Sequence, residues 1–259
     1  MRIPVMRGII DRRILVNYHV DPSVLATLLP APFRPKLVGG VGMVGICLIR
    51  LKGVRPRFVP GFLGISSENA AHRTAVEWDE QGDPSGVIGR VREGVYIRRR
   101  DTNSRLNAWA GGRLFPGVHH HAEFTVKETP EQFEVALKSD DGVTSMAVRA
   151  RLTGQLPTTS VFRTLDAASA FFQAGSLGYS ATSDPARFHG LELHCPTWHV
   201  EPLAVEEVRS SFFDDESLFP RGSIAFDCAL LMRGLQHEWH GQEDLCCQQS
   251  AVPALAHLA

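Results

Sequence analysis

Lysine is scarce in this sequence. The 259 residues include 27 lysines and arginines together, and only four of these are lysines. They are Lys36, Lys52, Lys127 and Lys138. Since imine chemistry on a side chain needs a lysine amine, these four side chains are the only ones that qualify for it.

Long hydrophobic runs and an excess of charge are also missing. No apolar stretch reaches the roughly 20 residues that a membrane-spanning helix needs, and the formal net charge is −1. The N-terminal segment has basic residues on both sides of a short apolar stretch, without the small-residue cleavage site of a signal peptide. We therefore expect a cytoplasmic protein that binds neither nucleic acid nor membranes.

The cysteines do not form a disulfide framework. There are five, an odd number with uneven spacing: Cys47, Cys195, Cys228, Cys246 and Cys247. The adjacent pair near the C-terminus lacks the C-x-x-C spacing of a zinc site. The nearby sequence His237-Glu238-Trp239-His240 places its histidines three apart, whereas a metalloprotease helix needs them four apart. We interpret this segment as surface sequence.

The hydrophobic pattern predicts many strands and few helices. Helices are expected at 22–29, after the cap Asp21, and at 165–174, before Gly175. Strands are expected at 41–51, 70–78, 87–100, 124–126, 133–137, 146–152, 191–200, 204–213 and 223–235. Strands and helices do not alternate, so we expect one α+β domain at 1–241, predominantly antiparallel β, forming a cupped sheet or β-barrel with a few short helices. Residues 242–259 are expected to form a flexible tail.

A glycine-rich segment, Gly40-Val41-Gly42-Met43-Val44-Gly45, matches the pattern G-x-G-x-x-G. A dinucleotide site requires a helix directly after this pattern. Here the β-prone residues 46–49 follow it. We therefore interpret the segment as a turn that leads into a core strand, and we expect no cofactor.

Polar side chains are densest between Arg92 and Phe124. The segment contains Arg98, Arg99, Arg100, Arg113, His119, His120 and His121. On a strand, the first and third histidines point to one face and the second points to the other. Two histidines on one face make half of a typical zinc site, and adjacent strand histidines are more often hydrogen-bonded residues, so we expect no metal. The segment is the best candidate for the wall of a ligand site.

An acidic residue also stands out. Glu68 follows a glycine- and proline-rich stretch and comes just before an alternating strand. Next to a cavity, such a carboxylate is a plausible acid or base. From spacing alone, a solvated turn residue is an equal alternative.

Several short motifs follow one another in a specific order. They are His19-Val20-Asp21, Leu28 to Phe33, Gly42 to Leu51, Ser67-Glu68-Asn69, Gly94-Val95-Tyr96, Arg113 to Pro116 and His194 to Val200. In this order the chain resembles the uncharacterised YqjF-like family (domain of unknown function 2071) of the acetoacetate-decarboxylase-like superfamily. The resemblance implies a cupped antiparallel sheet that closes into a barrel or cone around an internal cavity.

The resemblance also has consequences for the chemistry. In acetoacetate decarboxylase a cavity lysine forms a Schiff base with a keto acid, and an apolar pocket with a cationic neighbour lowers the pKa of its amine. The step before that lysine matches Gly117-Val118-His119, which places His120 in the lysine position. Since an imidazole forms no iminium, we do not expect acetoacetate decarboxylase activity. Glu68 matches a cavity glutamate, and Arg113 matches an arginine in the turn before the lysine.

The first functional hypothesis is a protein that binds a small organic anion, or an enzyme without a Schiff base, with a cavity inside the barrel. Glu68 and His120 are the expected catalytic residues. The expected ligand-binding residues are Arg98, Arg100, Arg113, His119 and His121.

Two alternatives stay open. One is a lyase or hydratase that acts on keto acids through a displaced lysine, with Lys127 as the leading candidate. The other is a structural or partner-binding domain whose barrel is filled by the four tryptophans and fourteen phenylalanines. The expected partner is a small-molecule ligand, and a homo-oligomer is compatible with the sequence.

Overall fold

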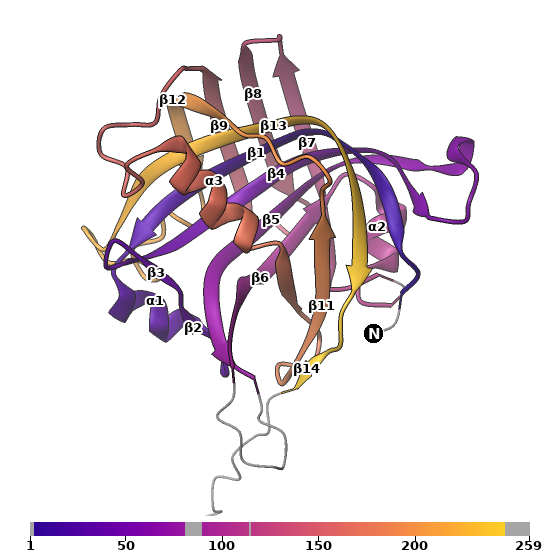
Figure 1. Cartoon of the computed structure of the whole chain (residues 1–259), viewed down its shortest axis with the longest axis horizontal. Coiled ribbons are helices and arrows are strands. Elements are labelled where there is room, and N and C mark those ends of the chain that lie inside the picture. The colour runs from indigo at the N-terminus through magenta and orange to yellow at the C-terminus, as the bar shows by residue number, and fades with distance from the viewer. Residues whose placement is uncertain (1–2, 81–89, 114, 247–259) are drawn as a thin grey trace, which may run out of the picture.

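Strands dominate the computed structural model, which describes residues 3–80, 90–113 and 115–246 (Figure 1). The long strands are β1 (Met6–Val20), β4 (Val41–Pro56), β5 (Ile65–Asp79), β6 (Val91–Thr102), β7 (His119–Glu128), β8 (Gln132–Ser139), β9 (Ser145–Leu152), β10 (Leu177–Ala181), β11 (Arg187–His194), β12 (Glu201–Ser210) and β13 (Ile224–Gly241). The short strands are β2 (Arg34–Pro35), β3 (Leu37–Val38) and β14 (Leu245–Cys246). The helices are α1 (Pro22–Leu28), α2 (Arg105–Ala110) and α3 (Leu165–Ala174), with a 3-10 turn, η1 (Gly61–Leu63).

Strand pairing closes this sheet into a barrel. In the described part of the chain, nine strands follow one another in the order β6-β7-β8-β9-β12-β13-β1-β4-β5, and the pairing of β5 with β6 completes the ring. A second closure runs through β10 and β11, which link β6 to β13. The strands β13, β1, β4, β5 and β6 belong to both closures, so they have a packed interior on each face.

The shared strands send alternate side chains to the two interiors. On β4, Ile46 and Leu48 belong to the apolar core of the nine-strand ring. Cys47 and Ile49 belong to the core on the other face, together with residues of α3. Because the side-chain period of a strand is two, the parity of a polar residue decides which interior it enters.

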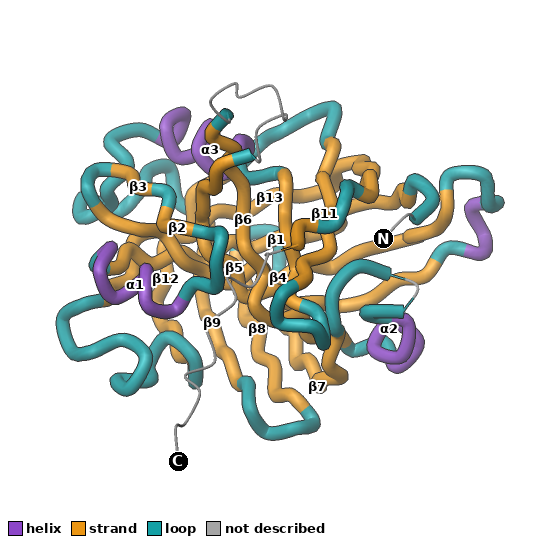
Figure 2. Tube along the Cα trace, turned by 90° about the horizontal axis from the view of Figure 1, so that it is seen from below, coloured by secondary structure: helices purple, strands orange, loops and turns teal. Residues whose placement is uncertain are grey.

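The helices cover particular parts of the barrel. Helix α3 lies across β4 and β5 (Figure 1) and packs Phe172 into the second core. Its cap is Thr164, whose hydroxyl accepts a hydrogen bond from the backbone N–H of Ala167 at 3.1 Å. Figure 2 shows α1 and α2 at opposite sides of the strand layers.

The predicted fold class is confirmed, and both predicted helices are present. A turn at Gly39 and Gly40, with φ of 58° and 85°, leads into β4 as expected, but the rest of the glycine-rich segment, residues 41–45, is already strand. Strand β5 is longer than predicted, so Glu68 lies within a strand and not in a turn. The predicted strand at 191–200 is wrong beyond residue 194, where β11 ends.

Parts of two predictions lie outside the described residues. These are positions 87–89 of the strand expected at 87–100, and positions 247–259 of the expected tail. Within the tail, the short strand β14 pairs with β11. No helix in the described ranges is long and apolar enough to cross a membrane.

Two buried histidines in the sheet have no hydrogen-bond partner among the described residues. His72 and His237 are 3% and 2% exposed, and both nitrogens of each ring are unpaired. The ring of His72 packs against Phe212 and Phe213, with centroids 5.2 and 5.7 Å away. Burial, and to a smaller extent nearby arginines, lowers the pKa of each imidazole to about 4.

We predict that the protein loses stability as the pH falls from about 6.5 to about 4. The unfolded chain takes up protons on these histidines near pH 6.5, whereas the folded protein keeps them neutral until about pH 4, so acid favours unfolding. Each histidine contributes on the order of 3 kcal/mol over this window. Urea unfolding at several pH values in this window measures the slope of the free energy of unfolding against pH. His72→Phe should make this slope smaller, whereas the exposed control His194→Asn should leave it unchanged. An unchanged slope in His72→Phe would contradict this account.

Candidate functional site

A cavity of about 470 Å³ lies between α2, the ends of β4 and β5, and Trp239 of β13. Its wall is mainly apolar and includes Leu51, Val54, Ile65, Leu106, Trp109 and Phe115. Leu106 and Trp109 are 55% and 58% exposed, so α2 forms part of the mouth. We call this space the outer cavity; its volume lies in the range typical of small-molecule sites.

Two polar side chains meet at the wall of the outer cavity. Arg100 of β6 and His119 of β7 are direct neighbours across the parallel strand pair. The Nε and Nη2 atoms of Arg100 donate to the hydroxyl of Ser180, at 3.1 and 3.0 Å. Gly111 packs so closely on His119 that a Cβ at this position would collide with the ring.

His119 is a neutral hydrogen-bond acceptor. Its Nδ1 lies 3.0 Å from the carbonyl oxygen of Gly117. Because a carbonyl only accepts, the proton is on Nδ1, which leaves a lone pair on Nε2. Burial, followed by the charge of Arg100, lowers the pKa of His119 to about 3. The imidazole therefore stays uncharged at physiological pH.

A second, smaller space of about 90 Å³ adjoins the outer cavity. The two share Ile49, Ala71, Arg100 and Trp239 as common wall. The smaller space, which we call the inner chamber, is also lined by Arg13, Cys47, Arg73, Phe172 and Trp198. It lies in the second interior, beneath α3.

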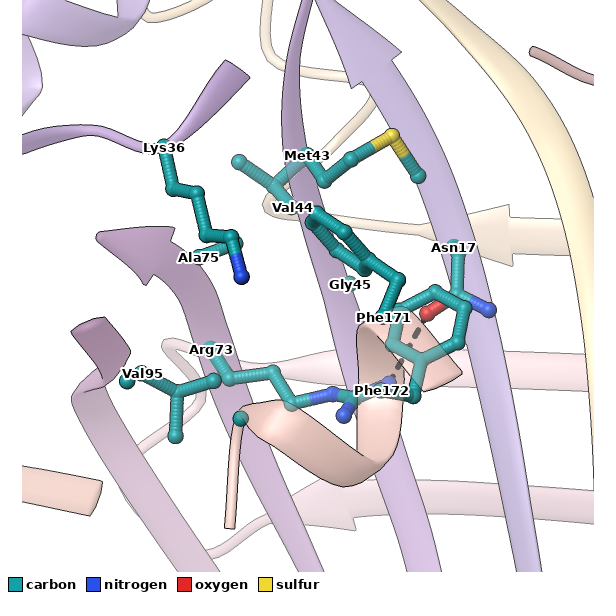
Figure 3. Close-up of a pocket in the computed structure, with 12 residues that line it drawn as sticks. Asn17, Lys36, Met43, Val44, Gly45, Arg73, Ala75, Val95, Phe171 and Phe172 are labelled. Carbon is teal, nitrogen blue, oxygen red and sulfur yellow. Dashed lines mark hydrogen bonds between the residues drawn. The ribbon is translucent and has the colours of Figure 1, made fainter. Parts of the chain in front are cut away.

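Arg73 of β5 is a buried cation with few partners (Figure 3). It is 9% exposed, and its Nη2 donates to Asn17 Oδ1 at 2.8 Å. Its Nε has no partner among the described residues. The guanidinium lies over the ring of Phe172, 5.2 Å from the centroid, which is a favourable cation–π contact.

Arg13 of β1 has sulfur and aromatic neighbours. Its Nε donates to Cys47 Sγ at 3.2 Å, and its Nη1 donates to Met232 Sδ at 3.7 Å. The guanidinium lies 5.8 Å from the centroid of the Trp198 ring. All of these neighbours are weak acceptors compared with a carboxylate.

The inner chamber therefore holds positive charge without negative charge. Among the described residues, no ion pair joins Arg13, Arg73 or Arg100 to a carboxylate, although all three line the chamber. Burial lowers the pKa of Arg73 and of Arg100 to about 10. Arg73 is buried, whereas Arg13 and Arg100 are partly exposed. Since buried charges in proteins are normally paired, Arg73 together with two further cations around one space favours an anionic ligand.

The lysines do not occupy this site. Lys36 lines a narrow pocket beneath α3 that shares Arg73 with the inner chamber (Figure 3), and its Nζ pairs with Glu93 at 2.7 Å. Lys127 is 73% exposed and lies 3.8 Å from Glu134. Among the described lining residues of the outer cavity and inner chamber there is no lysine. This placement does not support the displaced-lysine alternative.

Glu68 lies on the face of β5 opposite to Arg73. Its carboxylate accepts hydrogen bonds from Arg12 Nη2 and Arg50 Nε, both at 2.5 Å. Glu128 of β7 also pairs with these two arginines. Glu68 has the parity of Ala70, which belongs to the core of the nine-strand ring. The structure thus places Glu68 in a buried ion-pair cluster, apart from the described lining residues of the outer cavity and the inner chamber.

Four further candidates also lie apart from the lining residues. His120 pairs with Asp141 at 3.2 Å, and His121 pairs with Asp140 at 2.8 Å. Arg98 donates to the carbonyl of Leu28 at 3.0 Å, and Arg113 donates to that of Trp109 at 2.6 Å. Of the seven predicted site residues, the structure brings Arg100 and His119 together at the cavity. His119, and not His120, is the histidine that lines it.

No cluster of three or more potential metal ligands occurs in the described part of the chain. In the segment 237–240, His237 is buried and packs on Trp239, with ring centroids 4.5 Å apart. His240 instead pairs with Glu238 at 3.0 Å. The interpretation of this segment as surface sequence is therefore wrong for His237.

Sequence reasoning missed Arg13, Arg73, Cys47 and helix α2. A signal for Arg73 was present, because it shares parity with Ala71 and Ala75 in an otherwise apolar alternation. For α2, Ser104 is a cap followed three residues later by Asn107, whose backbone N–H it binds at 3.2 Å.

Comparisons with solved structures show a shared fold. An acetoacetate decarboxylase from Legionella pneumophila superposes with a TM-score of 0.58 at 10% identity, covering 95% of this chain and 88% of that chain. An acetoacetate decarboxylase-like enzyme from Sphingomonas wittichii gives 0.55 at 10% identity, with 96% and 94% covered. The enduracididine biosynthesis enzyme MppR in complex with pyruvate gives 0.54 at 12% identity, with 93% and 90% covered.

Sequence comparison identifies the family. No curated protein matches the chain. The model of an uncharacterised conserved protein family, DUF2071, matches residues 10–231. The chain therefore belongs to the DUF2071 family and shares its fold with acetoacetate decarboxylase.

Proposed function

We propose that this protein binds a small organic acid with an apolar body. The observation that carries the proposal is the set of three arginines without carboxylate partners, Arg13, Arg73 and Arg100, around the inner chamber. Arg100 also lines the outer cavity, so one ligand can place its carboxylate at the arginines and its apolar part in the outer cavity. Charge-assisted hydrogen bonds in a water-poor site supply affinity and orientation.

The size and chemistry of the outer cavity support an acid larger than pyruvate, the ligand of MppR. A space of about 470 Å³ with a mainly apolar wall suits an aliphatic or aromatic group. The neutral Nε2 of His119 would accept a hydrogen bond from a hydroxyl on the ligand. The same geometry supports a second candidate, an enzyme in which His119 takes a proton from the bound acid. The nine-strand ring itself is filled by an apolar core, and the outer cavity is the observation that disfavours a purely structural domain.

Thermal unfolding with matched ligands tests the proposal. Octanoate at about 100 times its Kd should stabilise the protein by about 2.7 kcal/mol, which raises Tm by about 5–10 °C. Octanamide has the same apolar chain without the charge and should have a much smaller effect. Equal effects of both compounds would contradict anion recognition, and no effect of octanoate or of shorter and aromatic acids would refute the proposal.

Chemistry through lysine is tested separately. With pyruvate and borohydride, we expect no lysine-dependent mass increase in the intact protein, because no described lysine lines the site. An adduct that Lys127→Met removes would revive the displaced-lysine alternative.

A further inference from the structure

Cys47 occupies the inner chamber together with the arginines. It lies on β4 and is 6% exposed, and its side chain lines the chamber. Arg13 Nε donates a hydrogen bond to its sulfur at 3.2 Å. Reactive cysteines in proteins lie in electropositive surroundings of this kind.

The other two arginines also interact with this sulfur. Burial lowers the pKa of Arg73 and of Arg100, and the proximity of Cys47 partly opposes that decrease in both. All three arginines therefore line the chamber together with this sulfur. Arg73 adds an independent sign of a ligand, because it is 91% buried and its Nε is unpaired while it lines the same chamber.

A second buried cysteine provides an internal contrast. Cys228 is 0% exposed and is not among the described lining residues of the chamber. Asn17 Nδ2 lies 3.7 Å from its sulfur. Burial, followed by the charge of Asp227, raises the pKa of this thiol. The two cysteines therefore share burial but differ in charge environment and in access to a cavity.

We propose that Cys47 is a nucleophile that captures electrophilic organic acids, in particular α,β-unsaturated acids. The proposal rests on the proposed function, because the arginines must first hold the carboxylate. The sulfur then forms a bond to the β-carbon, the π pair of the alkene moves to the α-carbon, and the α-carbon takes up the proton that the thiol gave up. No other group leaves, so the adduct has the summed mass of protein and acid.

The chamber has room for this reaction. Its volume of about 90 Å³ corresponds to about three water molecules, enough for a carboxylate and the adjacent carbons. The remainder of the acid would extend past Arg100 into the outer cavity, which shares that wall. Orientation by the carboxylate would hold the alkene near Cys47 and raise its effective concentration.

Alkylation by two reagents of similar size and different charge tests the inference on the native full-length chain. Iodoacetate is an anion and iodoacetamide is neutral; with both, the sulfur–carbon bond forms, iodide leaves and the thiol proton passes to buffer. Tryptic peptide mapping separates Cys47, in residues 37–50, from Cys228, in residues 222–233. Relative to the exposed Cys246, we expect at least a tenfold preference for iodoacetate at Cys47. Octanoate should slow that reaction, and Arg13→Gln should reduce the preference.

Other outcomes separate the two proposals. Labelling of Cys47 and Cys228 at the same slow rate would mean that only unfolding exposes Cys47, and it would overturn the inference. Absence of a preference for iodoacetate at Cys47, while octanoate still raises Tm, would overturn the inference and leave the proposed function intact. If no organic acid shifts the Tm, both the proposed function and the inference about Cys47 are refuted. An adduct of acrylate at Cys47, with the summed mass, would support the reaction itself.

Discussion

Replacing Arg100 with methionine is expected to remove most of the stabilisation by octanoate and to raise the Tm of the free protein. Arg100 lies at the wall between the outer cavity and the inner chamber, where the proposed carboxylate and apolar chain of the ligand meet. Removal of one partner from a buried, hydrogen-bonded charge pair costs about 2–4 kcal/mol, which corresponds to a roughly 30- to 1,000-fold weaker Kd.

The expected rise in the Tm of the free protein has a different cause. Burial lowers the pKa of Arg100 to about 10, so keeping this cation in the ligand-free interior opposes folding. Methionine fills similar space without charge, and replacement of poorly compensated buried charge by apolar groups often stabilises by about 1–4 kcal/mol. We expect about 1–2 kcal/mol, because the two hydrogen bonds to Ser180 are lost.

Arg98→Met is the matched control for this experiment. Arg98 lies two residues away on the same strand and is exposed, and its Nη2 donates only to the carbonyl of Leu28. Its replacement should leave octanoate binding unchanged. If Arg100→Met binds octanoate as tightly as the parent protein, the arginines of the inner chamber do not hold the ligand. If Arg100→Met binds weakly and is also less stable, Arg100 is a structural residue.

The barrel was predictable because its determinants are local. Alternating residues such as Met146, Val148 and Ala150 reveal a strand with one buried face, and their partners in the sheet have the same pattern. The second closure through β10 and β11 was not predictable, because strand order depends on contacts between distant parts of the chain.

The site was predicted only in part for the same reason. The segment from Arg92 to Phe124 does carry Arg100 and His119, the two predicted site residues that line the outer cavity. Arg73 and Cys47 come from strands with a packed interior on both faces. In such strands nearly every residue is buried, so sequence alone does not show which polar residues face a cavity and which, like Glu68, face another charged cluster.

Glu68→Gln is expected to cause a large loss of stability and little loss of octanoate binding. Glu68 accepts from Arg12 and Arg50 at 2.5 Å each, and the side chain of Arg12 is only 2% exposed. Removal of one member of a buried ion pair typically costs 3–5 kcal/mol, because the partner charge remains without compensation. For a chain of this size the corresponding decrease in Tm is on the order of 10 °C. An active-site acid would show the opposite result, with lost turnover or ligand affinity and little change in Tm.

A double variant distinguishes uncompensated charge from lost packing. The centre of the cluster contains two arginines, Arg12 and Arg50, and two glutamates, Glu68 and Glu128. At its edge Asp11 pairs with both Arg50 and Lys52. Glu68→Gln therefore leaves one positive charge in excess. Arg12→Met combined with Glu68→Gln restores the balance, because Arg50 and Glu128 remain as a pair. Urea unfolding should therefore show the double variant to be more stable than Glu68→Gln alone, whereas the exposed control Glu134→Gln should stay close to the parent protein. If the stability losses of Arg12→Met and Glu68→Gln simply add in the double variant, charge imbalance is not the cause of the loss in Glu68→Gln. The packing of the Glu68 side chain would then explain that loss.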